Sequence, residues 1–499
     1  MQEQYFDVLI IGAGLSGIGM ACHLSTELPE KSYAILERRQ RLGGTWDLFR
    51  YPGIRSDSDM FTFGYRFRPW NETKVLADGP SIRSYIRETA REYGVMDRIR
   101  FGCHVQSADW SSEEACWRVT ATDAESGEAR TWRCRFLVMG TGYYNYDAGY
   151  TPVLPGIERF RGQVIHPQHW PEDLDYAGRN VLVVGSGATA VTLVPAMAGT
   201  AGHVTMLQRS PSYIFSVPPE DRISGWLSRY LPERWVYAFA RRRNILTYRL
   251  IWNLSKRYPH MMRRLFLRGV RKRLGKDFDM THFSPKYKPW DERLCAVPGG
   301  DLFNAINAGA ASVVTDQIDT FTGTGVRLKS GRELEADIVI TATGLDLQLF
   351  GGMRIRRDGE TFDPSRRMMY KAVLVEDLPN FGVIFGYVNY PWTLKADIAS
   401  RYLCRLLAHM DRHGYDVAVP RDRAGCRLDS PFLDALTSGY VWRAEDRLMR
   451  QGSREPWRVL NDFKRDREVL QFGPIEDEGL EFESAGAAAR NKPAAAAAG

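Results

Sequence analysis

Two stretches of the chain repeat the same order of apolar and polar positions. The first runs from an apolar segment, 6–11 (FDVLII), through a glycine-rich turn into a helix-like stretch that ends near residue 28, and a short apolar segment follows at 33–36. The second has apolar segments at 180–185 (NVLVVG) and 203–207, on either side of another helix-like stretch. Short apolar runs beside glycine turns are typical of buried parallel strands. Both stretches therefore predict a strand–turn–helix–strand unit.

The first turn has the sequence Gly12-Ala13-Gly14-Leu15-Ser16-Gly17. In a dinucleotide-binding unit, Gly12 permits the tight turn, Gly14 lets the backbone approach a pyrophosphate, and Gly17 lets the helix pack closely on the strand. The N-terminus of the helix then faces the anion. Glu37 follows the second strand, at the distance where an acid binds the two ribose hydroxyls. We assign this first site to FAD.

The second turn has the sequence Gly185-Ser186-Gly187-Ala188-Thr189-Ala190, and its second strand is followed by Gln208-Arg209 instead of an acid. The spacings correspond, because Glu37 comes 25 residues after Gly12 and Arg209 comes 24 residues after Gly185. An acid at this position favours a free ribose diol, and an arginine favours a ribose 2′-phosphate. We assign this second site to NADPH.

Two further apolar segments, 136–142 (FLVMGTG) and 337–344 (DIVITATG), end in small residues and predict strands beside the two nucleotide sites. A chain of 499 residues is long enough for two to four domains. Its content of 44% hydrophobic and 25% charged residues is that of a globular protein. The predicted fold class is α/β, with two Rossmann-like dinucleotide-binding domains for FAD and NADPH. Only the Ala-rich segment 485–499 is predicted to be unstructured.

Cysteine content and hydropathy indicate the compartment. The seven cysteines are odd in number and include no CxxC pair, which favours a reducing cytoplasm and argues against a flavin disulfide reductase. No 18-residue window is uncharged and apolar, and no charged and apolar leader precedes residue 6, so neither a transmembrane helix nor a signal peptide is expected.

Positive charge is concentrated in one segment, 221–276, which has sixteen Lys and Arg residues against two acids, whereas the net charge of the whole chain is only +7. Apolar residues recur there at helical spacings, which predicts a basic helical insertion. They are Trp226, Leu227, Tyr230, Leu231, Trp235, Val236, Phe239, Leu246, Leu250, Ile251 and Leu254.

Two interpretations of this insertion remain open. In the first, the insertion rests on an anionic membrane surface, at the inner face of the membrane, and admits apolar substrates from it. In the second, the insertion is a lid that packs on the NADPH domain, and its arginines are solvated. Nucleic acid is not an expected partner, because no recognised binding motif accompanies the charge.

The segment between the two units contains a motif that resembles that of a known family. Its sequence, 160–171 (FRGQVIHPQHWP), resembles the fingerprint FxGxxxHxxxW(P/D) of type I Baeyer–Villiger monooxygenases, through Phe160, Gly162, His166, Trp170 and Pro171. The related flavin-containing monooxygenases and N-hydroxylases typically carry Phe or Tyr at the position of Trp170. The resemblance extends to about residue 482 and includes 43–46 (GGTW), 50–57 (RYPGIRSD) and 289–295 (PWDERLC).

The resemblance implies an FAD domain made from both ends of the chain and an NADPH domain interrupted by helices. The expected parts are 1–145 and 345–484 for FAD, 146–215 and 291–344 for NADPH, and 216–290 for the insertion. By resemblance, the FAD contacts are Glu37, Thr45, Trp46, Asp57 and the backbone of Val105. The corresponding nicotinamide nucleotide contacts are Arg55, Ser186, Gly187, Thr189, Gln208 and Arg209.

The same resemblance assigns the oxygen chemistry. Arg293 matches the active-site arginine, and Asp57 is expected to pair with it, although Asp59 is a rival for this position. The flavin peroxide that forms from FAD, NADPH and dioxygen must stay deprotonated to attack a ketone, and arginine supplies a cation that does not lose its proton. An apolar ketone would then give an ester or lactone.

Several alternatives remain. Oxygenation of sulfur in thioethers and thioamides can occur on the same scaffold, and a flavin-containing monooxygenase acting mainly on sulfur or nitrogen is the nearest alternative. An uncoupled NADPH oxidase or a non-catalytic flavoprotein is a further one. Glu292 stands where many family members have a lysine that helps to hold the 2′-phosphate, so NADPH selectivity rests mainly on Arg209. His166 and His169 lack acidic or thiol companions, and no metal site is predicted.

Overall fold

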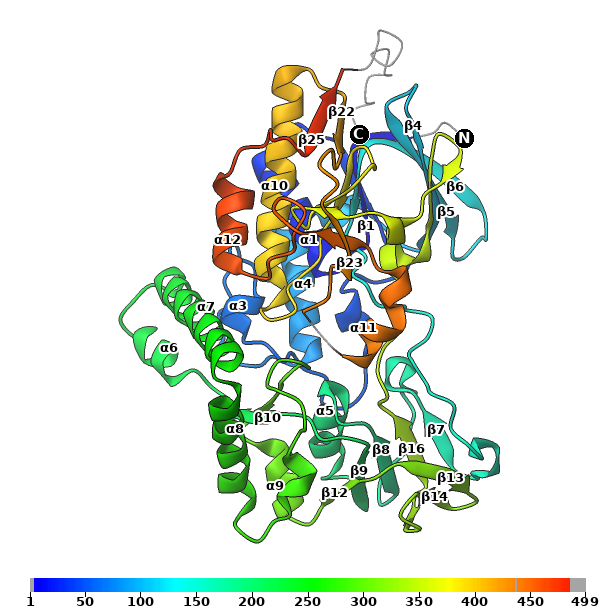
Figure 1. Ribbon diagram of the computed structural model, residues 1–499, viewed down its shortest axis with the longest axis vertical. Helices are drawn as coiled ribbons and strands as arrows, with labels where there is room; N and C mark the ends of the chain where they lie inside the picture. The colour runs from blue at the N-terminus through cyan, green and yellow to red at the C-terminus, as the bar shows by residue number, and fades with distance from the viewer. Residues whose placement is uncertain (1–3, 436–437, 485–499) are drawn as a thin grey trace.

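The chain forms two lobes, one above the other in Figure 1. In this computed structural model the described residues are 4–435 and 438–484. Both ends of the described chain lie in the upper lobe, and the middle of the chain forms the lower lobe (Figure 1). The predicted unstructured segment 485–499 lies outside the described residues.

A mixed sheet forms the centre of the upper lobe. Its strand β1 (Gln4–Ile11) lies between β2 (Tyr33–Leu36) and β6 (Ala129–Met139), and it is parallel to both. Helix α1 (Leu15–Glu27) follows β1 directly. The sheet also contains β3 (Ile99–Arg100), β4 (Cys103–Ser111), β5 (Cys116–Asp123), β17 (Arg354–Arg357), β18 (Glu360–Thr361), β19 (Met369–Tyr370), β20 (Leu374–Val375) and β21 (Phe381–Val383).

The C-terminal part of the chain completes this lobe. Strand β21 pairs in parallel with β6, and α10 (Trp392–His413) lies against α1, where the Trp392 indole donates to Ser16 Oγ at 2.9 Å. The remaining elements of the upper lobe surround this centre. They are α2 (Thr45–Leu48), α3 (Met60–Phe63), α4 (Gly79–Glu92), β22 (Val417–Pro420), β23 (Arg427–Pro431), α11 (Gly439–Ala444), β24 (Arg450–Gly452), α12 (Phe463–Arg467) and β25 (Leu480–Glu483).

The lower lobe contains a five-stranded parallel sheet in the order β12-β9-β8-β16-β7. These strands are β7 (Gln163–Ile165), β8 (Asn180–Val184), β9 (His203–Gln208), β12 (Ala311–Thr315) and β16 (Ile338–Thr341). Helix α5 (Ala188–Met197) follows β8. The lobe also holds β10 (Ile214–Val217), β11 (Cys295–Pro298), α9 (Asp301–Asn307), β13 (Ile318–Thr322), β14 (Gly325–Leu328) and β15 (Glu333–Glu335). The predicted α/β fold with Rossmann-like units is confirmed.

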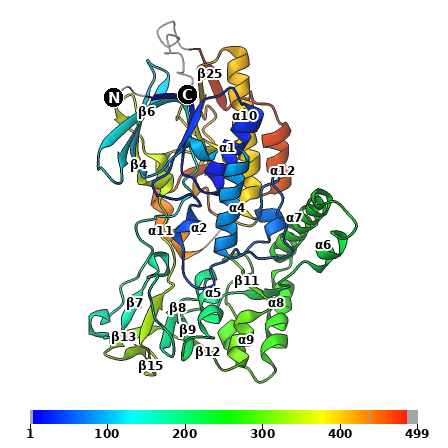
Figure 2. The ribbon, with the colours of Figure 1, turned by 180° about the vertical axis from the view of Figure 1, so that it is seen from behind.

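Three helices form an arm that leaves the lower lobe, as both views show (Figures 1 and 2). They are α6 (Arg222–Leu227), α7 (Glu233–Arg257) and α8 (Pro259–Leu274). Helix α8 lies against α9 and β10 of the lower lobe, but α7 contacts the upper lobe at α3. The lid interpretation, in which the insertion packs on the NADPH domain, is therefore wrong for α7. Among the described residues, no helix has both the length and the apolar character needed to cross a bilayer.

Candidate active site

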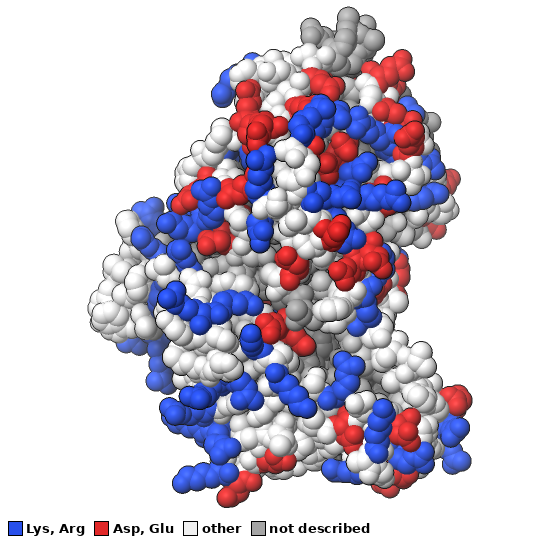
Figure 3. Space-filling model, viewed as in Figure 1, with Lys and Arg blue, Asp and Glu red and all other residues white. Residues whose placement is uncertain are grey.

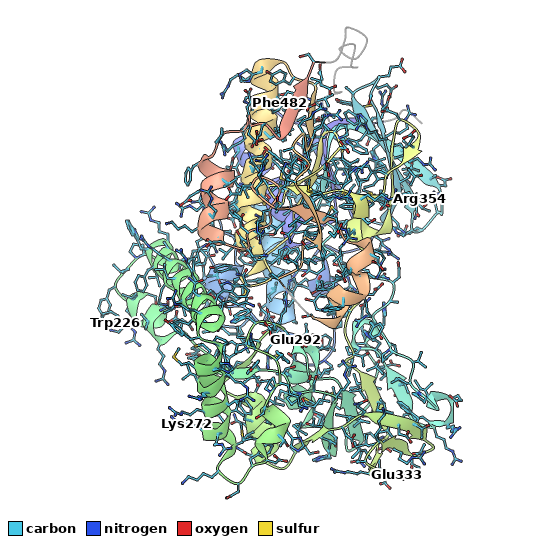
Figure 4. All side chains as sticks on the ribbon, viewed as in Figure 1. Trp226, Lys272, Glu292, Glu333, Arg354 and Phe482 are labelled. Carbon is cyan, nitrogen blue, oxygen red and sulfur yellow. The ribbon has the colours of Figure 1, made fainter. Side chains whose placement is uncertain are left out.

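A cavity of about 900 Å³ lies between the two lobes and reaches both glycine turns. Gly12, Gly14 and Ser16 line it from the first turn, and Gly185 to Thr189 line it from the second. The cavity therefore joins the two sites that the sequence predicts separately. Glu292, which Figure 4 labels where the two lobes meet, also lines it.

The first turn admits only glycine at two of its positions. Gly12 has φ +98°, and a Cβ atom there would lie 2.9 Å from the carbonyl oxygen of Gly140, just after β6. A Cβ atom on Gly17 would lie 1.8 Å from the carbonyl oxygen of Gly12. Gly17 is thus held under the turn by close backbone packing, as the sequence predicts for the third glycine of such a motif.

Glu37 follows β2 directly, beside this turn, and is almost fully buried. Its Oε2 accepts from the Ala13 N–H at 2.7 Å, and its Oε1 accepts from the Arg39 N–H at 2.9 Å. Burial raises the pKa of this carboxyl group, and the two backbone hydrogen bonds oppose the rise. The cavity wall therefore presents an oxygen acceptor beside the glycine turn, where a ribose diol would lie.

The other predicted FAD contacts also lie on the cavity wall. Thr45, Trp46, Asp57 and Val105 all line it, and Thr45 Oγ1 lies 3.3 Å from the hydroxyl of Tyr146. The structure thus brings together residues that lie far apart in the sequence, on α2, on β4 and in the loop before α3. Their role as flavin contacts remains a prediction.

The second turn has the same construction but is more open. Gly185 has φ +143°, and a Cβ atom there would lie 2.3 Å from the carbonyl oxygen of Ala342, just after β16. Gly187 is exposed, and a Cβ atom there would meet no atom within 4 Å among the described residues. The Ser186 hydroxyl donates to the carbonyl oxygen of Ser210 at 2.9 Å. A ligand could therefore approach this turn from solvent.

Arg209 is exposed and lines the cavity at this end, as does Glu292. Burial raises the pKa of the Glu292 carboxyl group, and the positive charge of Arg209 opposes that rise. An acid and an arginine therefore share the region where a 2′-phosphate would bind, and their charges act on such a group in opposite directions.

Two predicted nucleotide contacts have other partners. The Gln208 side chain is buried and donates to the His282 carbonyl oxygen at 2.7 Å and to Thr315 Oγ1 at 2.9 Å. Gln208 is not among the described residues that line the cavity. The Gln208 side chain therefore points to protein partners and not into the cavity, and its role as a nucleotide contact stays a prediction. Arg55 lines the cavity, and its guanidinium forms an ion pair with Asp301.

Arg293 and Asp57 meet in the cavity wall, with Arg293 Nη1 3.9 Å from Asp57 Oδ2. Arg293 Nη2 also lies 3.5 Å from the Tyr143 hydroxyl, at the outer limit of a hydrogen bond. Asp59 has a different role, because its Oδ1 accepts from the Thr62 N–H at 3.0 Å and caps α3. The rivalry between the two acids is therefore settled in favour of Asp57 as the neighbour of Arg293.

Two tyrosines beside Arg293, Tyr143 and Tyr144, were missed in the sequence. They follow the predicted strand at 136–142 directly, which is the signal that could have found them. Tyr440, from α11, lines the same cavity, and the sequence had indicated the aromatic residues from Tyr440 to Trp442 as part of an apolar pocket. Burial raises the pKa of Tyr143 to about 12, so its hydroxyl keeps its proton. The buried Arg293 Nε and Tyr440 hydroxyl have no hydrogen-bond partner among the described residues.

The fingerprint residues lie away from the cavity. A Cβ atom on Gly162 would lie 2.2 Å from the Asp337 carbonyl oxygen, and the Phe160 ring packs on Phe321 with ring centroids 5.8 Å apart. His166 Nε2 lies 3.3 Å from the carbonyl oxygen of Gly344, at the end of the segment that follows β16. Trp170 packs at the edge of the core of the lower lobe, and Pro171 follows it. The fingerprint residues thus pack within the lower lobe and against the segment that connects the two lobes.

The residues present fit two dinucleotides. Each glycine turn lines the cavity, and each leads into the N-terminus of a helix, where N–H groups and the helix dipole favour a pyrophosphate. The unpartnered Arg293 Nε and Tyr440 hydroxyl between the two turns offer hydrogen-bonding atoms to a bound group. The fold and the site together therefore support a two-nucleotide enzyme.

Comparison with known proteins places this site in a family. Residues 75–352 match the family model for flavin-binding monooxygenase-like proteins, and residues 10–75 match the one for the NAD(P)-binding Rossmann-like domain. The chain is 60% identical over 487 residues to the putative FAD-containing monooxygenase MymA of Mycobacterium tuberculosis, covering 97% of this chain and 98% of that protein. It is 51% identical over 482 residues to the FAD-containing monooxygenase EthA of the same species, covering 96% and 98%.

Solved structures share the fold. A steroid monooxygenase bound to NADP superposes with a TM-score of 0.76 at 22% identity, over 96% of this chain and all of that one. An open structure of cyclohexanone monooxygenase superposes with a TM-score of 0.74 at 21% identity and the same coverage. The matches confirm the prediction of a monooxygenase with a flavin and a nicotinamide nucleotide as cofactors. The chain belongs to the flavin-binding monooxygenase-like family.

Proposed function

We propose that the chain is a Baeyer–Villiger monooxygenase that converts apolar ketones into esters or lactones, with NADPH as electron donor. One atom of dioxygen enters the ketone and the other leaves as water. The observation that carries the proposal is Arg293, which lies in the wall of the cavity that joins the two glycine turns, beside Asp57 and Tyr143. Figure 4 shows the neighbouring Glu292 where the lobes meet.

The assignment of FAD to the first turn and NADPH to the second rests on two residues. Glu37 offers a carboxylate to a ribose diol, and Arg209 offers a guanidinium to a 2′-phosphate. The family model that matches 10–75 describes an NAD(P)-binding Rossmann-like fold, so these two side chains, and not the fold of either unit, carry the assignment.

The chain's own residues supply charge and position. When bound, FAD supplies the redox and oxygen-activating chemistry. Arg293 keeps its proton at any physiological pH and presents a rigid fork of donors, so it stabilises negative charge that develops beside it. Asp57, 3.9 Å away, orients the guanidinium. Tyr143, protonated because burial raises its pKa to about 12, can donate to a substrate oxygen.

The substrate end of the cavity is aromatic. Phe63, Tyr387, Tyr390, Trp392 and Tyr440 line it, and such a wall favours an apolar molecule with few polar groups. A small apolar ketone fits this description. A thioether fits it too, so the nature of the product has to distinguish the two.

The decisive experiment compares the wild-type enzyme with Arg293→Ala and Arg293→Lys. Each is reduced anaerobically with NADPH and then mixed with dioxygen and a panel of cyclic and linear ketones. We expect Arg293→Ala to accept hydride at a near wild-type rate but to form no ester, because reduction needs nucleotide geometry and oxygen transfer to a carbonyl needs the cation. Partial ester formation by Arg293→Lys would support the role of charge.

Ester formation by Arg293→Ala at a near wild-type rate would overturn this role. A wild-type enzyme that oxygenates thioethers but no ketone would instead support the alternative of a monooxygenase acting on sulfur. Both outcomes are read by mass spectrometry of the products, with NADPH consumption measured in parallel to detect uncoupled turnover.

A further inference from the structure

Helix α7 has apolar side chains on two opposite faces. Its inner face is held against the upper lobe, where the Tyr237 hydroxyl donates to the Tyr65 carbonyl oxygen at 2.9 Å and Arg241 Nη1 donates to that of Gly64 at 2.8 Å. A second set of apolar residues follows the helix at positions that turn away from this contact. They are Trp235, Phe239, Leu246 and Leu250, each 49–62% exposed.

The spacing of this second set makes it one stripe. Its successive members are four, seven and four positions apart. The exposed Arg242 lies between Phe239 and Leu246, three positions after the first and four before the second. Residues at such spacings lie above one another on one face of a helix. Helix α7 contacts α3, α6 and α8, but the four residues of the outer stripe stay exposed beside these contacts, so the stripe has no role in the packing of α7 on the upper lobe.

The exposed apolar surface continues over the rest of the arm. Ile223, Trp226, Tyr230 and Leu231 extend it over α6 and the following loop, and Tyr258, Met261 and Leu265 extend it along α8. Eleven of the fifteen exposed large hydrophobic side chains of the described residues lie in 223–265. We call this surface the arm patch. Soluble surfaces rarely concentrate apolar side chains in this way unless the patch binds something.

Positive charge surrounds the arm patch. Segment 221–276 has only two acids, Asp221 and Glu233, against sixteen Lys and Arg residues. Asp221 already pairs with Arg243. On α8, the exposed Arg268 and Lys272 follow Tyr258, Met261 and Leu265 at helical spacing. Figure 3 shows the outer end of the arm as white surface with blue patches above and below it, and Figure 4 places Trp226 and Lys272 on this side of the molecule.

We propose that the arm patch docks on an anionic lipid surface. Tryptophan, phenylalanine and leucine on the outer face of a helix suit the boundary between headgroups and acyl chains, and flanking arginines and lysines suit anionic headgroups. Long basic side chains can also keep their charge at the headgroups while their stems cover apolar surface. The combination of aromatic residues and unneutralised positive charge favours this occupant over a second copy of the chain, whose own arm carries the same positive charge.

The docking surface lies next to the candidate active site. On the inner side of α7, the Tyr248 ring packs on Tyr390, which lines the cavity, with ring centroids 6.4 Å apart. The Tyr248 hydroxyl also lies 3.4 Å from the backbone N–H of Asp59, which donates to it. One helix therefore separates the arm patch from the aromatic wall of the cavity, and an apolar molecule dissolved in the lipid would lie near the substrate end of the site.

The test is co-sedimentation of the full-length holoenzyme with vesicles of phosphatidylcholine alone or mixed with phosphatidylglycerol, at low and high salt. We expect pelleting only with the anionic vesicles, and release at high salt because the attraction is screened. The charge variant Arg268→Glu/Lys272→Glu should bind at least about tenfold more weakly. The stripe variant Trp235→Ser/Leu246→Ser/Leu250→Ser should lose binding to a similar or greater extent.

Matched controls lie elsewhere on the surface. Phe472→Ser changes an exposed aromatic residue outside the arm, and Arg354→Glu reverses an exposed charge on the opposite side of the molecule (Figure 4), so both should bind like wild type. The proposal would be overturned if every arm variant kept salt-sensitive pelleting, or if wild type did not pellet at low salt. A different outcome is that wild type forms a dimer without lipid and does not bind vesicles, and that only the stripe variant is monomeric. This outcome would identify a second copy of the chain as the occupant.

Discussion

The two glycine turns share one construction and differ in how far the protein encloses them. In each, a glycine with positive φ lies close to a backbone carbonyl oxygen just after the neighbouring parallel strand. This oxygen belongs to Gly140 for Gly12 and to Ala342 for Gly185. The first turn is covered by the rest of the upper lobe, where a Cβ atom on Gly14 would lie 3.5 Å from the Cα atom of Gly44. The second leaves Gly187 and Arg209 exposed.

This difference corresponds to the two ways in which an enzyme uses a nucleotide. A cofactor that stays bound through many turnovers benefits from a site that encloses it, whereas a co-substrate that delivers hydride and leaves needs access to solvent. Glu37 in the enclosed turn is almost fully buried, and Arg209 in the open turn is exposed. We therefore expect substitutions at the first turn to change flavin retention and stability, and those at the second to change only nicotinamide nucleotide kinetics.

The largest effect is expected from Gly17→Ala. Its Cβ atom would lie 1.8 Å from the carbonyl oxygen of Gly12, a backbone atom that cannot move without opening the turn. Overpacking of this kind costs about 1–3 kcal/mol or more. Gly17→Ala should lower Tm and the flavin content, measured as the ratio of flavin to protein absorbance.

Gly187→Ala, at the position equivalent to Gly14, is the comparison substitution in the open turn, because the position equivalent to Gly17 there is already Ala190. The Cβ atom added at Gly187 meets nothing within 4 Å among the described residues. Gly187→Ala should keep the flavin and a near wild-type Tm. If Gly187→Ala loses the flavin while Gly17→Ala keeps it, the assignment of the two turns is reversed.

The sequence predicted the local parts of this picture and missed those that depend on distant contacts. The strands and turns were predictable because each depends on a few adjacent residues, and the predicted strand at 33–36 coincides with β2. Gln208 was expected to contact the nucleotide, and only the fold shows that its side chain hydrogen-bonds to His282 and Thr315, so its role as a nucleotide contact stays a prediction. Asp57 and Asp59 could not be separated, because only the fold shows which of them caps α3.

The arm shows the same limit on a larger scale. Helical spacing of apolar residues predicted helices in 221–276, but it could not say which apolar face is covered. Helix α7 has two such faces, and only its contact with Tyr65 and Gly64 of the upper lobe reveals that the stripe from Trp235 to Leu250 is the outer one.

A smaller and more selective effect is expected from Arg209→Ala. A hydrogen bond to a charged group contributes about 1.5–3 kcal/mol, so the preference for NADPH over NADH should narrow by about tenfold or more. The measurement is kcat/KM for both nucleotides. Arg38→Ala is the matched control, since Arg38 lines the cavity beside Glu37 in the enclosed turn. It should leave the preference unchanged, whereas an equal loss with both nucleotides in Arg209→Ala would contradict the 2′-phosphate assignment.

The smallest expected effect concerns Glu292, the acid that shares the open site with Arg209. Because burial raises the pKa of its carboxyl group, Glu292 loses its proton at a higher pH than an ordinary glutamate does. As pH rises through this range, the new negative charge opposes the 2′-phosphate, so KM for NADPH should rise relative to KM for NADH.

Glu292→Gln should abolish this part of the pH dependence and lower KM for NADPH at neutral pH by about two- to fivefold, the size expected of a partly exposed charge. Measuring the ratio of the two KM values from mildly acidic to neutral pH separates this effect from titration of groups common to both nucleotides. The 2′-phosphate itself titrates in the same way in both proteins, so identical profiles for wild type and Glu292→Gln would show that Glu292 does not act on the nucleotide.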